Sequence, residues 1–205
     1  MISIVDYGVG NVQAFLNLFS RLGIEARRAD TSSILKESSH LVLPGVGHFD
    51  HAMNKLNNSG LREPLENLVI GSKIPLLGIC VGMQMLANES EEGLLPGLGW
   101  ISAEVRAFSN NKNSSQLPLP HMGWNNINIK KSILLSEKKI NSLTEFYFLH
   151  SYYFDAFDKS IVTATSNYGL NFDSMVSYEN IHGVQFHPEK SHKWGEELLK
   201  SFSKL

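Results

Sequence analysis

Short apolar runs alternate with a helical pattern along the first half of the chain. The runs at 2–5, 41–43 and 74–79 are too short for buried helices and predict strands, and a further strand is expected at 24–28. From Val12 to Leu22, apolar residues recur at the i, i+3, i+4, i+7 spacing of an amphipathic helix, and Gly23 can end it. We therefore expect an open, mostly parallel, flavodoxin-like sheet with helices on both faces.

The second half of the chain has a different pattern, with closely spaced strand-like segments and few helical ones. These segments lie at 100–108, 126–129, 145–149, 161–166 and 175–178. Residues 176–186 predict a hairpin around Glu179-Asn180, residues 109–116 an exposed loop, and residues 194–202 the closing helix. We expect a more antiparallel, β-rich second half. Because no repeat or linker is visible, a single domain over 1–205 is expected.

Composition excludes some partners. With 42% hydrophobic residues in 205 and a net charge of −2, the chain can form a sizeable core but gives no electrostatic case for nucleic acid or an anionic membrane. No apolar run approaches the roughly 18 residues of a membrane helix, and no secretion signal follows Met1. One cysteine permits no internal disulfide. A cytoplasmic protein with small-molecule or protein partners is expected, and no metal or cofactor.

The one cysteine lies between two glycines, in the order Gly78-Ile79-Cys80-Val81-Gly82. This is the thiol form of the G-x-S-x-G nucleophile elbow, which joins a strand to a helix by a sharp turn. At the start of a helix, backbone N–H groups favour the thiolate, and the Val81 N–H could stabilise an oxyanion. The alternative is a buried cysteine that acts only as a small hydrophobe.

A second glycine loop, Pro44-Gly45-Val46-Gly47, follows the strand expected at 41–43. The carboxyl ends of parallel strands form the ligand-binding edge of such sheets, and flanking glycines would let the Val46 N–H turn towards a substrate. The alternative is a simple turn. A dinucleotide site is rejected at the first loop, because Gln13 takes the place of the third glycine after Gly8 and Gly10.

A base for the cysteine is offered by His187-Pro188-Glu189. In an extended segment these two side chains share a face, so Glu189 can orient His187 while His187 serves Cys80. Metal binding by His187, Glu189 and His192 is the weaker alternative, because the spacing defines no common geometry. The remaining histidines are assigned elsewhere: structural positions for His121 and His150, and surface or loop positions for His40, His48, His51 and His182.

Taken together, these motifs resemble the class I, or triad, glutamine amidotransferases, and the resemblance runs end to end. It is closest to the branch that serves histidine biosynthesis, since Met83 replaces a histidine common in other branches. The markers, besides those above, are Asp6-Tyr7-Gly8-Val9-Gly10-Asn11, Ser90-Glu91-Glu92-Gly93, Pro120-His121-Met122-Gly123-Trp124-Asn125 and His150-Ser151-Tyr152-Tyr153.

The resemblance implies a glutaminase with a Cys-His-Glu triad that forms a glutamyl thioester. Cys80 would attack the side-chain amide of L-glutamine, His187 would transfer the proton and Glu189 would orient His187. The oxyanion would rest on the Val81 and Val46 amides. Substrate-binding positions implied by the resemblance are Gly45, Gly47, Gln84, Glu92, His150, Ser151 and Tyr152.

The resemblance also implies a partner: a (β/α)8-barrel cyclase subunit that receives ammonia through a tunnel and makes imidazole glycerol phosphate and aminoimidazole carboxamide ribotide. The matching docking positions of this heterodimer are Asn11, Trp124, Tyr147 and Lys190. Departures from the family pattern in Asn11-Val12-Gln13-Ala14 and in Lys190-Ser191-His192-Lys193-Trp194 leave the acceptor open, so a paralogue that supplies ammonia for amidation of surface sugars is the alternative. Another cysteine hydrolase, or a non-catalytic subunit that has kept the fold, are the alternatives from other classes.

Overall fold

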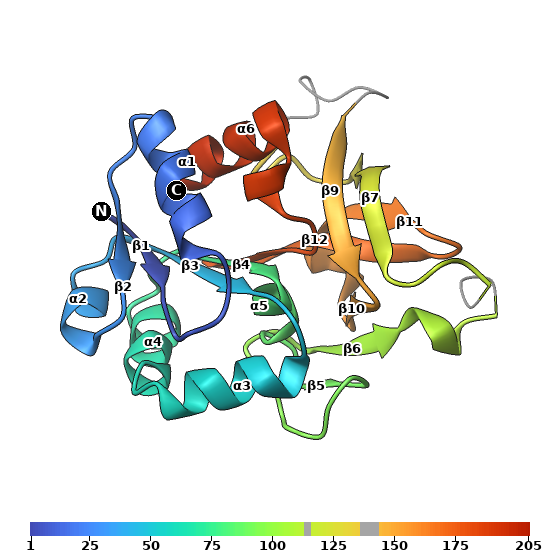
Figure 1. The fold of residues 1–205 in the computed structure, drawn as a ribbon, viewed down its shortest axis with the longest axis horizontal. Coiled ribbons are helices and arrows are strands. Elements are labelled where there is room, and N and C mark those ends of the chain that lie inside the picture. The colour runs from blue at the N-terminus through green and yellow to red at the C-terminus, as the bar shows by residue number, and fades with distance from the viewer. Residues whose placement is uncertain (113–115, 136–143) are drawn as a thin grey trace.

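The computed structural model describes residues 1–112, 116–135 and 144–205 (Figure 1). Its largest sheet in the described residues has eight strands in the order β2-β1-β3-β4-β13-β12-β11-β8. The strands are β2 (Ala26–Ala29), β1 (Ile2–Val5), β3 (His40–Gly45), β4 (Leu76–Cys80), β13 (Ile181–Val184), β12 (Asn171–Tyr178), β11 (Val162–Asn167) and β8 (Asn128–Ile129).

The first five strands of this order are parallel and the other three antiparallel. The parallel part has the 2-1-3-4-5 order of flavodoxin-like sheets, so the predicted fold class is confirmed. After His40, the residues of β3 and all those of β4 are apolar and buried, because both faces of these strands are covered. The predicted hairpin is also confirmed, with Tyr178 opposite Ile181.

Helices cover both faces of the parallel strands. In Figure 1, α1 (Val12–Arg21) and α6 (His192–Phe202) lie together on one side, and α3 (Phe49–Asn58) and α4 (Arg62–Glu66) on the other. The shorter helices are α2 (Ser32–Lys36), α5 (Val81–Gln84), the π-helix η1 (Asn67–Gly71) that continues α4, and the 3₁₀ turns η2 (Phe108–Asn110), η4 (Lys159–Ile161) and η5 (Pro188–Lys190). In α1 the buried residues are Val12, Phe15, Leu18 and Phe19. The predicted apolar face is confirmed at Val12, Phe15 and Phe19, whereas its other members, Leu16 and Leu22, are only partly buried.

Two small sheets complete the second half. One pairs β10 (Tyr152–Ala156) with β6 (Ala103–Ala107) and β6 with β5 (Glu89–Ser90), and the other pairs β7 (His121–Asn126) with β9 (Glu145–His150). The β-rich character predicted for this half is therefore observed. Of the loop expected at 109–116, positions 109 and 110 belong to η2, and 113–115 lie outside the described residues.

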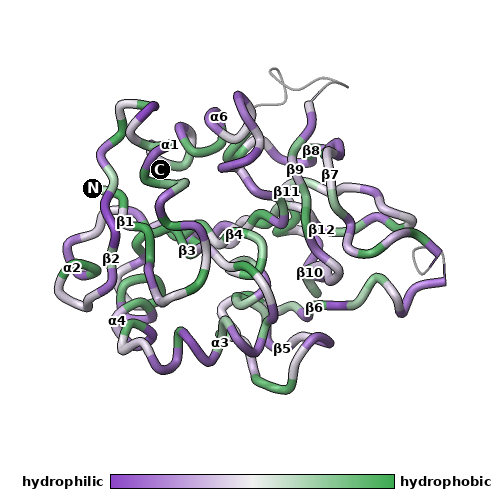
Figure 2. The backbone as a smooth tube through the Cα atoms, viewed as in Figure 1, coloured by the Kyte–Doolittle hydropathy of each residue, from purple (hydrophilic) through white to green (hydrophobic). Residues whose placement is uncertain are grey.

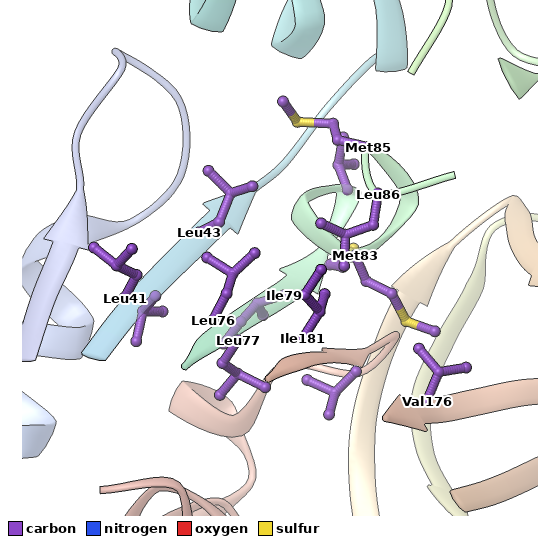
Figure 3. Close-up of a cluster of buried hydrophobic side chains, with 14 of the residues drawn as sticks. Leu41, Leu43, Leu76, Leu77, Ile79, Met83, Met85, Leu86, Val176 and Ile181 are labelled. Atoms are coloured by element: carbon purple, nitrogen blue, oxygen red, sulfur yellow. The ribbon is translucent and has the colours of Figure 1, made fainter. Parts of the chain in front are cut away.

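The core follows the central strands, which carry long hydrophobic stretches in Figure 2. Figure 3 shows the side chains of β3, β4 and the segment after Cys80 in one cluster with Val176 and Ile181. Leu43, Leu77 and Met83 are completely buried in it. In the part of the chain that the structure describes, no helix is long and apolar enough to cross a bilayer.

Candidate active site

The backbone at Cys80 makes a sharp turn between β4 and α5. Cys80 has φ 54° and ψ −112°, a conformation that a residue with a side chain adopts only under strain. A Cβ on Gly78 would lie 2.8 Å from the Gly82 carbonyl oxygen, and one on Gly82 only 1.9 Å from that of Leu43. The two glycines are therefore required by close backbone contacts, and the predicted elbow is observed.

The helix after the elbow is shorter than the sequence pattern suggests. Apolar residues continue to Leu86, but α5 ends at Gln84 after one turn. The N–H groups of Leu98 and Gly99 donate to the carbonyls of Met85 and Ala87, which occupies acceptors that a longer helix would use. Because one turn aligns few peptide dipoles, neighbouring side chains gain importance for the charge on the sulfur.

His187 and Glu189 are held at the neighbouring strand end. The Nδ1 atom of His187 lies 2.8 Å from Oε1 of Glu189, and both side chains are buried. The His187 N–H donates to the Tyr147 carbonyl at 2.8 Å, and the Ser191 hydroxyl donates to the His187 carbonyl at 2.6 Å. These bonds fix the segment on β9 and at the start of α6, so the imidazole is rigidly presented.

The charge state of His187 follows from its surroundings. Burial disfavours the imidazolium, but the negative charge of Cys80, a hydrogen bond to its sulfur and the Glu189 carboxylate together raise the pKa of His187 to about 10. The His187 imidazole is therefore protonated at neutral pH, where it can stabilise negative charge on the neighbouring sulfur and has a proton to donate.

A cavity of about 390 Å³ brings most of the predicted site residues together. Its lining includes the three triad residues and both oxyanion candidates, Val46 and Val81, together with Gly47, Gln84, Glu92, His150, Ser151, Tyr152, Asn11 and Lys190. Gly45, Trp124 and Tyr147 do not line it. Gly45 packs against the elbow instead, because a Cβ there would lie 2.4 Å from the Gly82 nitrogen.

The two oxyanion candidates differ in burial. Val81 is buried at the first position of α5, whereas the Val46 side chain is 43% exposed in the loop after β3. Gly47 has φ 80°, and no atom of the described residues lies within 4 Å of the place where its Cβ would be. The loop therefore has both the space and the backbone freedom that rotation of a peptide requires.

Polar groups in the cavity are bound to one another. The Gln84 Nε2 donates to the Tyr152 carbonyl at 3.0 Å, and the same carbonyl accepts from Nδ1 of His150 at 2.8 Å. Burial raises the pKa of Glu92, against the opposing effect of a hydrogen bond from the Phe49 N–H. The carboxylate is thus desolvated in the cavity, where a substrate ammonium group would be its natural partner.

The structural role expected for His121 and His150 is confirmed. His121 Nδ1 lies 3.0 Å from His150 Nε2, and the His121 ring stacks between Phe148 and Tyr168. Burial lowers the pKa of His121 to about 4; burial, together with the charges of His121 and His187, lowers that of His150 to about 3. Both are therefore neutral at pH 7.

The assignment of His182 to the surface or a loop was wrong. His182 is 4% exposed in β13, a strand whose residues are all buried, and its ring centre lies 6.3 Å from that of Phe202 in α6. Its Nδ1 is 2.9 Å from the Ser177 hydroxyl, and burial lowers its pKa to about 4.

One site residue escaped the sequence analysis. Gln185 is completely buried, and its Nε2 lies 3.7 Å from the Cys80 sulfur. The signal was its place two residues before His187 in the extended segment, which puts both side chains on one face.

Three of the predicted docking residues lie beside the cavity in a cluster with His192. Trp124, which is 46% exposed, stacks on the His192 ring at 5.2 Å between centroids. Tyr147 meets Trp124 edge-on, and Lys190 Nζ lies 5.3 Å from the centre of the Tyr147 ring. We call these four residues the Trp124 cluster. Asn11 caps α1 by accepting from the Ala14 N–H.

A cysteine on a strand–helix elbow of an open α/β sheet, with a His-Glu pair at the next strand end, is the arrangement expected of a cysteine hydrolase. The family model "Glutamine amidotransferase class-I" matches residues 3–204, and the chain belongs to this family.

Two relatives that carry the same name match this chain from end to end. The chain is 52% identical to "Imidazole glycerol phosphate synthase subunit HisH" of Bdellovibrio bacteriovorus over 207 residues, and 46% identical to the subunit of that name from Leptospira interrogans over 206. Both alignments cover 100% of each chain. A solved glutamine amidotransferase, 19% identical and covering 99% of this chain and 97% of its own, has a TM-score of 0.76, and PurLQS from Thermotoga maritima, 15% identical with the same coverages, has 0.73. These two structures share the fold.

Proposed function

We propose that this chain is the glutaminase subunit of an imidazole glycerol phosphate synthase. It hydrolyses L-glutamine to glutamate and delivers ammonia to a cyclase subunit for histidine biosynthesis. Full-length similarity to HisH subunits supports the assignment of the pathway. The observation that carries the chemistry is that Cys80, His187 and Glu189 line one cavity, with a His187–Glu189 contact of 2.8 Å.

In the first half-reaction, the Cys80 thiolate attacks the side-chain amide carbon of glutamine. The oxyanion that forms is stabilised by the N–H of Val81 and, after rotation of the loop, by the N–H of Val46. His187, already protonated, donates its proton to the amide nitrogen. The C–N bond breaks, ammonia leaves, and a glutamyl thioester remains on the sulfur.

In the second half-reaction, His187 is neutral and accepts a proton from an attacking water. The C–S bond breaks, glutamate leaves, and the sulfur departs with its electron pair as thiolate. Glu189 keeps Nδ1 of His187 occupied, so Nε2 is the nitrogen that exchanges protons on the cavity side. The cycle ends with the same thiolate–imidazolium pair with which it began.

Substrate recognition follows from the other cavity groups. Glu92 provides a carboxylate for the α-amino group, while Ser151, Tyr152 and Gly47 provide hydroxyl and backbone donors for the α-carboxylate. Gln84 and His150 hold the floor of the cavity at the Tyr152 carbonyl.

The partner is a (β/α)8-barrel cyclase that docks on Asn11 and the Trp124 cluster. Free ammonia is protonated in water, so it must pass directly to this subunit, in which the imidazole ring is closed. The heterodimer works in the cytoplasm, where a lone cysteine stays reduced. Partner binding is expected to turn the Val46 peptide and thereby raise the turnover of glutamine.

The test is glutamate release by this chain alone and then with the cyclase subunit of the same source, loaded with its nucleotide ligand. Strong stimulation is the expected result. If a glutamine-like electrophile labels Cys80 but the cyclase does not stimulate turnover, the ammonia acceptor would instead be a surface-sugar amidating synthase. Hydrolysis of peptides or esters in place of glutamine would identify another cysteine hydrolase, and absence of both labelling and turnover would identify a non-catalytic subunit.

A further inference from the structure

Gln185 links the catalytic sulfur to the floor of the cavity. Its Oε1 accepts a hydrogen bond from Nε2 of Gln84 at 3.1 Å, and its own Nε2 lies 3.7 Å from Sγ of Cys80. The side chain is completely buried and Gln84 is 2% exposed. A buried primary amide is costly unless its polar atoms are bound, so both ends of Gln185 are committed to these contacts.

The orientation of the Gln185 amide follows from an atom that can only accept. The Tyr152 carbonyl accepts from Nε2 of Gln84, which fixes the direction of the Gln84 amide. The second hydrogen of that Nε2 then points to Gln185, whose oxygen must face it. The nitrogen of Gln185 is therefore the atom directed at the sulfur.

The neutral side chains of His121 and His150 help to fix the Tyr152 carbonyl to which Gln84 donates. Because the Tyr152 carbonyl also accepts from Nδ1 of His150, Nε2 of His150 is an acceptor and takes the hydrogen of His121 Nδ1. The Asn125 amide completes the chain by donating to His121 Nε2 at 3.2 Å. A directed series of hydrogen bonds thus keeps this carbonyl, and through it both glutamines, in place.

The Cys80 sulfur also lies near a hydrogen-bond acceptor, which disfavours the thiolate. Besides His187 and Gln185, the sulfur has the Leu149 carbonyl oxygen 3.8 Å away, which accepts from a thiol but repels a thiolate. Gln185 donates, so it stabilises the thiolate and offsets the Leu149 carbonyl. A hydrogen bond to a charged group is stronger than one to a neutral group, and the effect on the charged sulfur therefore dominates.

We propose that Gln185 is a further catalytic residue, whose amide N–H holds the Cys80 sulfur as thiolate before attack on the substrate carbon and again when sulfur departs from the thioester. This role rests on the proposed glutaminase function. In acylation the S–C bond forms with the thiolate's electron pair, and in deacylation the pair returns to sulfur. The N–H donor is strongest at these two stages, because thioester sulfur is a poor acceptor.

The test measures alkylation of Cys80 by iodoacetamide from pH 5 to pH 10 in the full-length chain, which requires no turnover. Gln185→Met keeps the length of the side chain but removes the donor, and Gln185→Glu replaces the donor by a charge that repels the thiolate. We expect the midpoint of the rate-versus-pH curve to move up by about one unit in Gln185→Met, a tenfold change, and further in Gln185→Glu.

Ser177→Ala is the matched control, because it removes a hydrogen bond from the same hairpin, between Ser177 and His182, without touching the cavity. Its midpoint should equal that of the wild type. If Gln185→Met does not fold, as judged by thermal unfolding, Gln84→Met takes its place, since loss of the Gln84 donor frees the Gln185 amide to turn.

An unchanged midpoint in the folded variant overturns the role of Gln185. The proposed function is tested by a separate result: it would be wrong if the wild-type chain released no glutamate, with or without its cyclase. The two outcomes are read from different experiments and cannot be confused.

Discussion

Glu92 accepts a hydrogen bond from the backbone N–H of Phe49 at 2.8 Å. Phe49 is the first residue of α3 and follows the Val46–Gly47 loop after one further position. The carboxylate proposed to hold the substrate's amino group therefore also anchors the helix that begins where the oxyanion loop ends.

Asp50 makes a second link between α3 and the segment that follows Glu92, and here the side chain that accepts belongs to α3. Its carboxylate accepts from the N–H groups of Leu94 and Leu95, at 3.0 and 3.1 Å. A Cβ on Gly93 would lie 1.9 Å from the Asp50 carboxylate, so the contact is tight. Because Phe49 and Asp50 are held at the start of α3, rotation of the Val46 peptide is confined to the residues between β3 and α3.

Two substitutions at Glu92 separate its two roles. In Glu92→Gln an amide oxygen can still accept from Phe49, but the charge that binds the substrate ammonium is lost. The KM for glutamine should rise about 10- to 100-fold with a smaller change in kcat. Glu92→Ala removes both interactions, so kcat should also fall. Steady-state kinetics of the two variants decide, and equal kcat values would show that the anchor on Phe49 has no part in turnover.

Backbone strain at Cys80 can be measured without the thiol. Cys80→Ala and Cys80→Gly both abolish glutamine hydrolysis, but only alanine retains the side chain that makes φ 54° unfavourable. We expect Cys80→Gly to be more stable than Cys80→Ala by about 1 kcal/mol, the reverse of the usual order. Urea denaturation of the two variants measures the difference. Greater stability of the alanine variant would mean that the elbow is unstrained.

Close packing of the elbow makes a second stability prediction. Gly82→Ala would place a methyl group 1.9 Å from the Leu43 carbonyl oxygen, which belongs to a central strand and cannot retreat. The free energy of unfolding should fall by about 3 kcal/mol or more. Gly71→Ala is the control, since in the described part of the chain no atom lies within 4 Å of the place where its Cβ would be. Alanine there should be neutral or stabilising by about 0.5 kcal/mol. Comparable losses in both variants would contradict the packing argument.

The sequence pattern was sufficient where chemistry depends on local geometry. Gly78, Cys80 and Gly82 define the elbow by spacing alone, because so tight a turn leaves no room for side chains two residues before and two residues after the cysteine. The pairing of His187 with Glu189 was also predicted and is observed, but the extended segment assumed for it was wrong, because Glu189 lies in the 3₁₀ turn η5. Such rules act within a few residues and need no knowledge of tertiary contacts.

What the pattern could not supply depends on contacts between distant segments. Gln185 meets Cys80 because β13 and β4 are neighbours in the sheet, a pairing that no local rule specifies. His182 is buried with a ring contact to Phe202 of α6, which lies twenty positions further along the chain. The one-turn length of α5 is set by the segment at 97–99, which takes the free carbonyls. In each case an element far along the chain overrides the local preference.

Three buried histidines should make the protein sensitive to acid. The pKa values of His121 and His182 are lowered to about 4 and that of His150 to about 3, below the ordinary 6.5. Between pH 6.5 and 4 the unfolded chain therefore binds more protons than the folded one, and the free energy of unfolding falls as pH falls. The loss should reach about 2 kcal/mol per histidine by pH 5.

Thermal unfolding measured from pH 7 to pH 5 tests this slope. His182→Asn keeps an acceptor near the position of Nδ1 that faces Ser177, but it cannot be protonated. This variant should lose less stability than the wild type over the same range. A parallel pH dependence of the two proteins would show that His182 is not the source of acid sensitivity.

The Trp124 cluster should carry the binding of the cyclase subunit. Trp124 is a large, half-exposed aromatic side chain that is already ordered by His192 and Tyr147, so little conformational entropy is lost on docking. Trp124→Ala should weaken binding about thirty-fold or more, measured by isothermal titration with the cyclase. Phe157→Ala is the control, because Phe157 is also exposed, at 58%, but lies outside the cluster and the cavity lining. Equal loss of affinity in both variants, or none in Trp124→Ala, would place the docking surface elsewhere on the molecule.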